Sequence, residues 1–279
     1  MDDKSGRQYV LITGASCGLG KELAKECAKR GMNLLLTALP NEEISELGDE
    51  FSQKYGVEVN TFEADLTKPE ELKKLAASIS EKYEVKILIN NAGLGGAKSF
   101  LDATTEYIEQ IVLLNMNALV LLTRLMLPNL KRQKNAYILN IASMASFSPM
   151  PFKTVYPASK AFVYSFSRGL DAELKGTGIS VSVAHPGGMR TNAEVTHSIE
   201  NYNRLIRSTT LSVEKVAQIC IKSLLKRKRT IIPGFINKIS WVLLKITPLW
   251  MRMKMMRSSI SKDIELQNNF QKQRGSLTK

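Results

Sequence analysis

Short apolar runs alternate with amphipathic stretches along most of the chain. Three runs, Val10–Ile12, Leu34–Leu36 and Ile87–Ile89, are apolar at every position, as strands must be when helices cover both faces of a parallel sheet. The predicted strands are Tyr9–Thr13, Asn33–Thr37, Val57–Ala64, Ile87–Asn91, Ala136–Ile141 and Ile179–Ala184. This order predicts an α/β fold, a Rossmann-type doubly wound parallel sheet with right-handed crossovers.

The stretches between these strands have the spacing of surface helices. Lys21–Arg30, Glu42–Tyr55 and Pro69–Lys82 show it most clearly. No repeat or low-complexity tract interrupts the pattern, and a chain of 279 residues can bury one sizeable core. We therefore expect a single domain over residues 1–232 and a C-terminal extension over residues 233–279.

Cysteine content and hydropathy predict the compartment. Cys17, Cys27 and Cys220 have no paired spacing and are too few for a disulfide framework or a metal site, which favours a reducing environment. Tyr9–Ile12 leads directly into a glycine-rich loop, so we interpret it as a strand and not a signal peptide. The best candidate for a membrane-spanning stretch, Trp241–Met251, is broken by a lysine and a proline. These features predict a soluble, cytoplasmic protein.

Basic residues are concentrated at the C-terminal end. From Lys222 to Lys279 there are 14 Lys or Arg and 2 Asp or Glu, which accounts for +12 of the net charge of +13. Two interpretations of this amphipathic extension remain open: a lid or oligomer contact, or a peripheral helix on an anionic membrane. Nucleic acid is disfavoured, because no binding motif accompanies the charge. The apolar residues that share one helical face are Ile236, Ile239, Val242, Leu243 and Ile246.

A glycine-rich loop follows the first strand and opens the first helix. Its sequence, from Thr13 to Gly20, reads TGASCGLG. Glycines let the backbone turn tightly and approach a pyrophosphate, which the positive N-terminal end of a helix attracts. The spacing G-x-x-x-G-x-G differs from the common G-x-G-x-x-G, and a glycine turn without a ligand is the alternative. A dinucleotide site is the sharper hypothesis.

A second turn, Asn90–Gly93, ends the fourth strand. Open α/β sheets bind ligands beyond the carboxyl ends of their strands, so this turn is predicted to lie beside the glycine loop. Taken alone it is also compatible with an ordinary Asn-Gly turn.

Ser143, Tyr156 and Lys160 form the third and strongest pattern. Tyr156 and Lys160 are four residues apart on a helix-like stretch and so share a face. At about 4 Å and an effective dielectric constant of about 20, an ammonium stabilises a phenolate by about 4 kcal/mol. Such a pair would bring the phenol pKa toward neutrality, where it can exchange protons with an alcohol. Ser143 follows the fifth strand and could bind the same substrate oxygen.

Together these motifs resemble the short-chain dehydrogenase/reductase family over roughly residues 7 to 232. The resemblance implies that Tyr156 is the acid/base and that Ser143 positions the carbonyl oxygen. Lys160 would hold the nicotinamide ribose and lower the tyrosine pKa, and Asn115 would anchor a water molecule in a proton relay. Asp65 would lie beside the adenine. The implied cofactor-binding residues are Gly14, Ser16, Cys17, Gly18, Leu19, Gly20, Asp65, Leu66, Asn91, Ala92, Gly93, Tyr156, Lys160, Pro186, Gly187 and Thr191.

The chain departs from the family pattern where the second strand ends. An NAD-specific relative has an acid there, and many NADP-specific relatives have an arginine, but this chain has Ala38 and Leu39. Cys17 replaces the basic residue that some relatives have in the glycine loop. No acid stands at the strand end to repel a 2′-phosphate, and Thr37 and Asn41 could donate hydrogen bonds to one. We therefore expect NADP(H), with NAD(H) possible.

The expected reaction is hydride transfer between this cofactor and a ketone or secondary alcohol. Apolar residues after Ser143 suggest a lipophilic substrate with a fatty-acyl, steroid-like or polyketide carbonyl. Two alternatives stay open: a non-catalytic dinucleotide-binding sensor or scaffold, and an epimerase or dehydratase on the same fold. We expect no metal, a small-molecule substrate and a homo-oligomer. His185 is interpreted as a structural residue, because Tyr156 already fills the role of acid/base.

Overall fold

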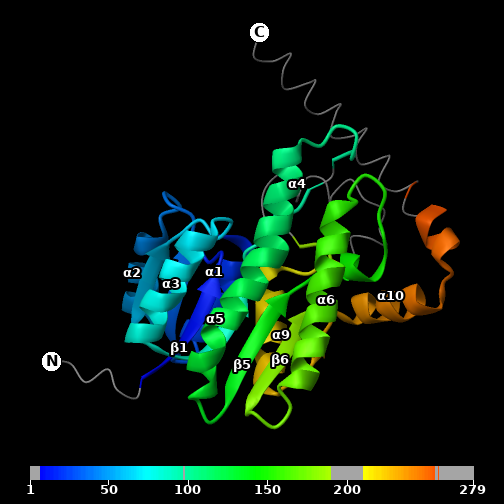
Figure 1. Ribbon diagram of the computed structural model, residues 1–279. Helices are drawn as coiled ribbons and strands as arrows, with labels where there is room; N and C mark the ends of the chain where they lie inside the picture. Colours follow the sequence, from blue (N-terminus) through cyan, green and yellow to red (C-terminus); the bar gives the residue numbers. More distant parts are fainter. Residues whose placement is uncertain (1–6, 97, 190–209, 255–256, 258–279) are drawn as a thin grey trace.

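A seven-stranded parallel sheet forms the centre of the molecule (Figure 1). The computed structural model describes residues 7–96, 98–189, 210–254 and 257. The strand order is β3-β2-β1-β4-β5-β6-β7, so the chain reverses its direction of winding between β1 and β4. This confirms the predicted doubly wound fold. The strands are β1 (Gln8–Thr13), β2 (Asn33–Ala38), β3 (Val59–Glu63), β4 (Glu84–Asn90), β5 (Ala136–Ile141), β6 (Ile179–Ala184) and β7 (Thr230–Ile231).

Helices cover both faces of the sheet, with α5 and α6 in front of it and α9 behind it in Figure 1. The helices on one face are α1 (Gly18–Ala28), α2 (Ile44–Tyr55) and α9 (Val213–Leu225). Those on the other are α3 (Pro69–Lys82), α5 (Leu119–Lys131) and α6 (Val155–Glu173). A further helix, α4 (Thr105–Val112), joins α5 through a π-helical segment, Leu113–Ala118. The extension forms α10 (Phe235–Ile246), which lies beyond the sheet edge.

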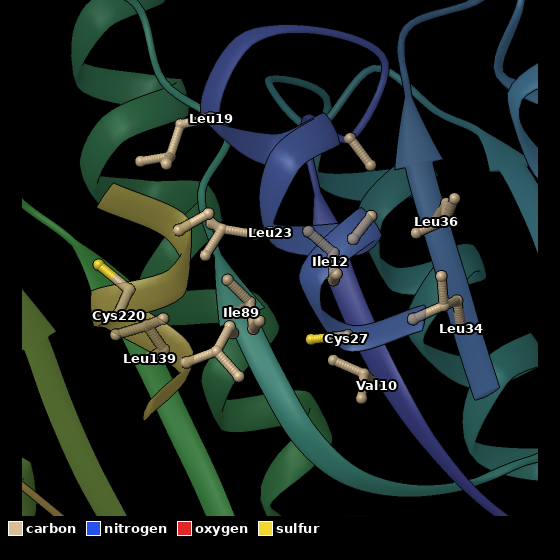
Figure 2. Packing of buried hydrophobic residues seen from close by; sticks show 14 of the residues in the cluster. Val10, Ile12, Leu19, Leu23, Cys27, Leu34, Leu36, Ile89, Leu139 and Cys220 are labelled. Atoms are coloured by element: carbon tan, nitrogen blue, oxygen red, sulfur yellow. The ribbon is translucent and has the colours of Figure 1, made fainter. Parts of the chain in front are cut away.

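Alternation along the central strands explains their continuous apolar sequence. Val10 and Ile12 face α1, whereas Leu11 between them faces α3 and α5. Figure 2 shows the first of these cores, in which Leu34, Leu36 and Leu139 pack beside the two buried cysteines of α1 and α9. Side chains on both faces are buried, so an apolar residue is needed at every position.

The predicted element limits differ from the structure mainly where polar residues enter a strand. β4 begins at Glu84, three residues before the predicted Ile87, because Glu84 and Val85 already pair with β1. β3 is shorter than the predicted Val57–Ala64, since only its central residues pair with β2. Helix α3 has the predicted limits. The predicted domain boundary between residues 232 and 233 falls in the turn before α10 and stays a prediction.

Among the described residues, the helix with the length and composition of a membrane span is not the candidate chosen from the sequence, Trp241–Met251. The continuous helix Thr105–Lys131 has 27 residues and a mean hydropathy of 1.7 in its most apolar window. Its middle and C-terminal parts pack on the sheet, where Leu122, Met126 and Leu130 are fully buried in the core with α3. Polar residues interrupt its apolar run, as in the other stretches of the sequence, although the helix as a whole is apolar.

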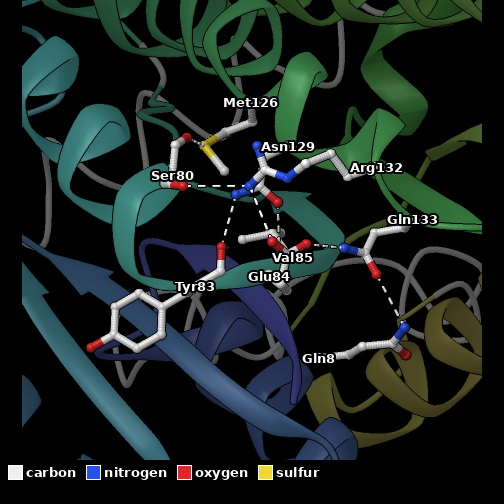
Figure 3. A network of polar contacts seen from close by, with 9 residues as sticks. All are labelled: Gln8, Ser80, Tyr83, Glu84, Val85, Met126, Asn129, Arg132 and Gln133. Carbon is white, nitrogen blue, oxygen red and sulfur yellow. Dashed lines mark hydrogen bonds and ion pairs between the residues drawn. The ribbon is translucent and has the colours of Figure 1, made fainter. Parts of the chain in front are cut away.

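Polar contacts fasten the end of α5 to the start of β4 (Figure 3). Asn129 is buried, and its side-chain amide donates to the carbonyl oxygen of Tyr83 at 2.8 Å. Its Oδ1 accepts from the Val85 N–H at 2.9 Å. The Asn129 side chain thus satisfies one backbone carbonyl and one backbone N–H group where β4 begins.

We predict that Asn129→Leu lowers the free energy of unfolding by about 2–3 kcal/mol, because a buried N–H loses its acceptor at similar side-chain volume. Chemical denaturation followed by circular dichroism measures this. Gln110→Ala, at an exposed position of α4, is the control and should change stability by less than about 0.5 kcal/mol. Equal stability of Asn129→Leu and wild type would contradict the assigned role.

Candidate active site

The glycine loop and the turn after β4 are in direct contact, as predicted. The Asn91 side-chain amide donates to the carbonyl oxygens of Thr13 at 3.0 Å and Gly14 at 2.9 Å. The Thr13 hydroxyl oxygen in turn accepts from the backbone N–H groups of Asn91 and Ala92, each at 3.0 Å. Both segments follow central strands at the carboxyl edge of the sheet, where its winding reverses and where such sheets bind ligands.

The backbone of the glycine loop packs so closely that two of its positions have no room for a side chain. Gly14 has a φ of 62°, and a Cβ atom there would lie 2.9 Å from the Cα of Ala92. A Cβ at Gly20 would lie 1.8 Å from the Gly14 carbonyl oxygen. Cys17 is the N-cap of α1, and no side chain caps this helix. This tight loop and the start of α1, which no side chain caps, are here called the glycine cradle, and together they fit a dinucleotide pyrophosphate.

Two predicted cofactor residues have buried side chains. Leu19 and Leu66 are 7% and 6% exposed and belong to the two cores. Only their backbone atoms could face a ligand. Cys17, by contrast, is exposed at the start of α1.

An acid that the sequence interpretation overlooked lies beside the glycine loop. The Ser16 hydroxyl donates to the Glu42 carboxylate at 2.6 Å. Glu42 follows the end of β2 in a turn where Asn41 and Glu43 both have positive φ, at 67° and 50°. It lies about 20 residues beyond the loop, the separation at which dinucleotide-binding folds place an acid. The sequence analysis did not consider this carboxylate, which lies beside the loop predicted to bind the cofactor.

The two side chains suggested as hydrogen-bond donors to a 2′-phosphate, Thr37 and Asn41, differ in burial. Thr37 has no exposed surface, and its hydroxyl finds no hydrogen-bond partner among the described residues. This contradicts its predicted part in binding a phosphate. Asn41 is exposed in the turn after β2 and remains available.

Asp65 organises its own turn. Its Oδ1 accepts from the backbone N–H of Thr67 at 3.0 Å and from the Thr67 hydroxyl at 2.6 Å. Burial raises the pKa of Asp65, but the Thr67 hydrogen bonds and the charge of Lys68 outweigh burial and leave the pKa below its usual value. Asp65 is thus held ionised at the end of β3, where it fixes the turn into α3.

Asn115 lies in the π-helical segment, a feature frequent at functional sites. It is 1% exposed, its Oδ1 accepts from the N–H of Leu94 at 2.8 Å, and its amide donates to the Leu94 carbonyl at 2.9 Å. The amide also donates to the Ser159 hydroxyl at 3.0 Å. Asn115 therefore holds the loop that follows Gly93 against α6.

Ser143, Tyr156 and Lys160 converge on the same edge of the sheet. Ser143 caps a short 3₁₀ helix after β5, and its hydroxyl accepts from the Ala145 N–H at 3.1 Å. Lys160 is 5% exposed, and its ammonium lies 5.9 Å from the centre of the Tyr156 ring. That ammonium donates to the Ile141 carbonyl oxygen at 3.0 Å. A Cβ on Gly93 would lie 3.1 Å from the Asn115 Oδ1 and 3.2 Å from the Lys160 Nζ, so these two residues meet there.

Burial shifts both titratable groups of this cluster toward their neutral forms. It raises the pKa of Tyr156, and the hydrogen bond with Ser143 lowers it only in part. Burial also lowers the pKa of Lys160 to about 8. The direction for Tyr156 is opposite to that expected from the Tyr–Lys pair alone, because loss of solvation opposes the phenolate.

His185 contacts the serine turn from the buried side, and its burial agrees with the structural role expected from the sequence. It is fully buried, and its Nδ1 lies 3.1 Å from the Ser143 carbonyl oxygen and 2.8 Å from the Ser146 hydroxyl. The centre of its ring lies 4.4 Å from that of Phe147 in a tilted contact and 5.1 Å from that of Tyr164 in an edge-on contact. Burial lowers the pKa of His185 to about 4, so at neutral pH the neutral imidazole braces the serine turn.

The Pro186-Gly187 turn is joined to the C-terminal extension. The Pro186 carbonyl oxygen accepts from the Met144 N–H at 2.9 Å. A Cβ on Gly187 would lie 2.8 Å from the side-chain amide of Asn237, which is buried in α10. No sequence motif pointed to Asn237, because its partner is 50 residues away. Thr191 lies outside the described residues.

A cavity of about 630 Å³ opens beside the segment between Ser143 and Tyr156. Pro151 and Phe152 form one wall, and the extension supplies Met253, Lys254 and Arg257. Phe152 has a φ of 61°, an unusual value for a bulky residue, and its carbonyl oxygen accepts from the Lys98 N–H at 2.8 Å. In the described part of the chain, no three His, Cys, Asp or Glu side chains are grouped closely enough for a metal ion.

Known proteins share both the sequence pattern and the fold. Residues 8–202 match the family model of the short chain dehydrogenases. A very-long-chain 3-oxoacyl-CoA reductase of Anas platyrhynchos is 37% identical over 182 residues, 64% of this chain and 58% of the relative. A 17-beta-hydroxysteroid dehydrogenase type 3 of Mus musculus is 32% identical over 191 residues, 67% of this chain and 62% of the relative. The chain thus matches less than two thirds of the length of these relatives.

Among solved structures, a short-chain dehydrogenase from Sphingobium yanoikuyae in complex with NADPH is 30% identical. It superposes with a TM-score of 0.76 over 85% of this chain and 92% of that chain.

We predict that Lys160 makes stability depend on pH. Its pKa is lower in the folded chain, about 8, than in the unfolded chain, 10.5, so the unfolded chain binds more protons between these values. The free energy of unfolding of wild type relative to Lys160→Met should therefore rise by about 2–3 kcal/mol between pH 7 and pH 10. Urea denaturation of both proteins across this range measures it.

Lys131→Met, at an exposed position of α5, is the matched control, and its difference from wild type should stay level over the same range. A level difference for Lys160→Met as well would show that Lys160 is not desolvated.

Proposed function

The chain belongs to the short chain dehydrogenase family, and we propose that it is an NAD(P)-dependent oxidoreductase that interconverts a ketone and a secondary alcohol. The observation that carries the proposal is the convergence of Ser143, Tyr156 and Lys160 beside the glycine cradle. A bound nicotinamide dinucleotide would supply or accept the hydride. The proton at the substrate oxygen is then the task of the protein.

Tyr156 is the proposed proton carrier. Because its pKa is raised, the phenol keeps its proton at neutral pH and can give it to the oxygen of a ketone as that oxygen gains charge. In the reverse direction, the phenol must first lose its proton, and the ammonium of Lys160 is the nearby group that favours this. Ser143 would hold the substrate oxygen through its hydroxyl.

The remaining residues position the cofactor and the relay. Lys160 would also hold the nicotinamide ribose, and the glycine loop would hold the pyrophosphate. Asn115, whose side chain already fixes Leu94 and Ser159, would anchor the water of a proton relay next to Lys160. Asp65, Asn91 and the Pro186-Gly187 turn complete the proposed cofactor site.

The proposed substrate is lipophilic, with a fatty-acyl or steroid-like carbonyl. Two relatives are named for a very-long-chain 3-oxoacyl-CoA and for a hydroxysteroid. The segment between Ser143 and Tyr156 is rich in apolar residues, and two of them, Pro151 and Phe152, line the cavity. The predicted homo-oligomer and cytoplasmic location stay predictions.

NADP(H) is the proposed cofactor. NADPH in the related Sphingobium structure and the lack of an acid at Ala38 support this choice. Glu42 opposes it, because a carboxylate bonded to Ser16 lies next to the loop that would face the 2′-phosphate. We therefore propose that Glu42 weakens the preference for NADP(H).

We predict that Tyr156→Phe reduces kcat by about 10³-fold, because the proton donor is lost, while NADPH affinity stays near normal. NADPH oxidation with a panel of ketones, followed by absorbance, measures turnover, and fluorescence titration measures affinity. Tyr55→Phe, on α2 far from the site, is the control. Unchanged turnover by folded Tyr156→Phe would refute the assignment, and substrate conversion by wild type without net oxidation of NADPH would favour an epimerase or dehydratase.

We predict that Glu42→Gln raises the affinity for NADPH relative to NADH by about tenfold, since it removes like-charge repulsion and keeps the side-chain size. Equilibrium fluorescence titration with the two reduced cofactors gives both Kd values without turnover. Glu50→Gln, an exposed acid on α2, controls for net charge. If both variants change the ratio equally, Glu42 has no specific role.

A further inference from the structure

The C-terminal extension exposes a group of large apolar side chains. Phe235, Ile246 and Trp250 are 76%, 72% and 70% exposed. Single exposed apolar residues are ordinary, but a contiguous apolar surface marks an interaction site. We define the C-terminal apolar face by the exposed residues of this segment: Phe235, Ile236, Ile239, Val242, Leu243, Ile246, Leu249, Trp250 and Met251.

The apolar face of α10 points away from the rest of the molecule. At about 100° per residue, its six exposed apolar residues fall within about 120° of the helix circumference. The opposite side carries Asn237, buried against Gly187, and Trp241, whose ring lies 6.2 Å from that of Phe147. In Figure 1, α10 projects at the edge of the molecule beyond α6. The helix is thus attached by its narrow polar and aromatic side.

Cations border this face. Lys238 and Lys245 follow one edge of the exposed apolar arc, and Lys245 places its ammonium 3.8 Å from the centre of the Trp241 ring. Arg252 and Lys254 follow in the next turn. No Asp or Glu occurs between Glu214 and Asp263. The surface therefore combines apolar side chains with charges of one sign.

We propose that the C-terminal apolar face docks on the surface of an anionic lipid bilayer. Apolar side chains would enter the interface between headgroups and acyl chains, and the bordering lysines would reach anionic headgroups. A second copy of this chain fits less well, because an isologous contact through the same face would bring Lys238 and Lys245 near their own copies. Among the described residues, this face is exposed and is not covered by the catalytic domain.

Docking would also place the cavity next to lipid. The same extension forms one wall of the cavity of about 630 Å³ through Met253, Lys254 and Arg257. It is fastened to the serine segment by Arg252, which donates to the Phe147 carbonyl oxygen at 2.8 Å. A lipophilic ketone could then pass from the bilayer to the site, a step that rests on the proposed function, whereas docking itself does not.

Co-sedimentation of the full chain with phosphatidylcholine vesicles, with and without phosphatidylglycerol, tests the proposal at low and high salt. Wild type should bind the anionic vesicles at low salt, and high salt or neutral vesicles should weaken binding. The triple variant Ile239→Ser, Leu243→Ser and Trp250→Ser should bind about tenfold more weakly. Lys238→Gln with Lys245→Gln should bind more weakly at low salt and show a smaller salt dependence than wild type. The matched control, Leu101→Ser with Val112→Ser, removes exposed apolar residues elsewhere and should bind as wild type does.

Absence of wild-type binding to anionic vesicles, or equal binding by the serine triple variant, would overturn the proposal. Dissociation of an oligomer by the same variant, with no vesicle binding by wild type, would instead assign the face to a second copy. Vesicle binding does not require turnover, so a Tyr156→Phe chain that still sediments with vesicles separates failure of the proposed reaction from failure of docking.

Discussion

The hydrogen bonds between Asn91 and the glycine loop hold the two halves of the sheet together at their functional edge. β1 and β4 are neighbours in the sheet, although β2 and β3 lie between them in sequence. The Asn91 amide donates to the carbonyl oxygens of Thr13 and Gly14, and Gly20 fits against the same carbonyl of Gly14. The shape of the cradle, the start of α1 and the position of Gly93 next to Lys160 all depend on this close approach.

Burial sets the electrostatics of the site. It disfavours the charged form of both Tyr156 and Lys160, so loss of solvation works against both the phenolate and the ammonium. A charged pair requires polar partners that replace the lost water. The Ile141 carbonyl supplies one such partner to Lys160, and hydroxyl groups of a bound ligand would supply others. The pKa values that govern proton transfer at Tyr156 and Lys160 therefore depend on the ligand that is bound.

Local pattern was enough to predict the sheet, the glycine loop and the meeting of that loop with the Asn90–Gly93 turn, because each follows from strand order and short spacing. It did not reveal Glu42 beside Ser16, since that contact depends on an unusual turn with two positive φ values. It missed the partnership of Asn237 and Gly187, which joins residues far apart in sequence. It also gave the wrong direction for the Tyr156 pKa, because spacing carries information on charge neighbours but not on depth of burial.

The contact between Asn237 and Gly187 has a consequence for how this chain can change over time. A side chain at position 187 would occupy the space that the Asn237 amide fills, so neither position can vary alone without a clash or a void. We therefore expect the Pro186-Gly187 turn and α10 to change together during evolution. In a lineage that lost the extension, position 187 would no longer be restricted to glycine. Shortening the chain before Asn237 by design would leave a void, which a larger residue at position 187 could fill.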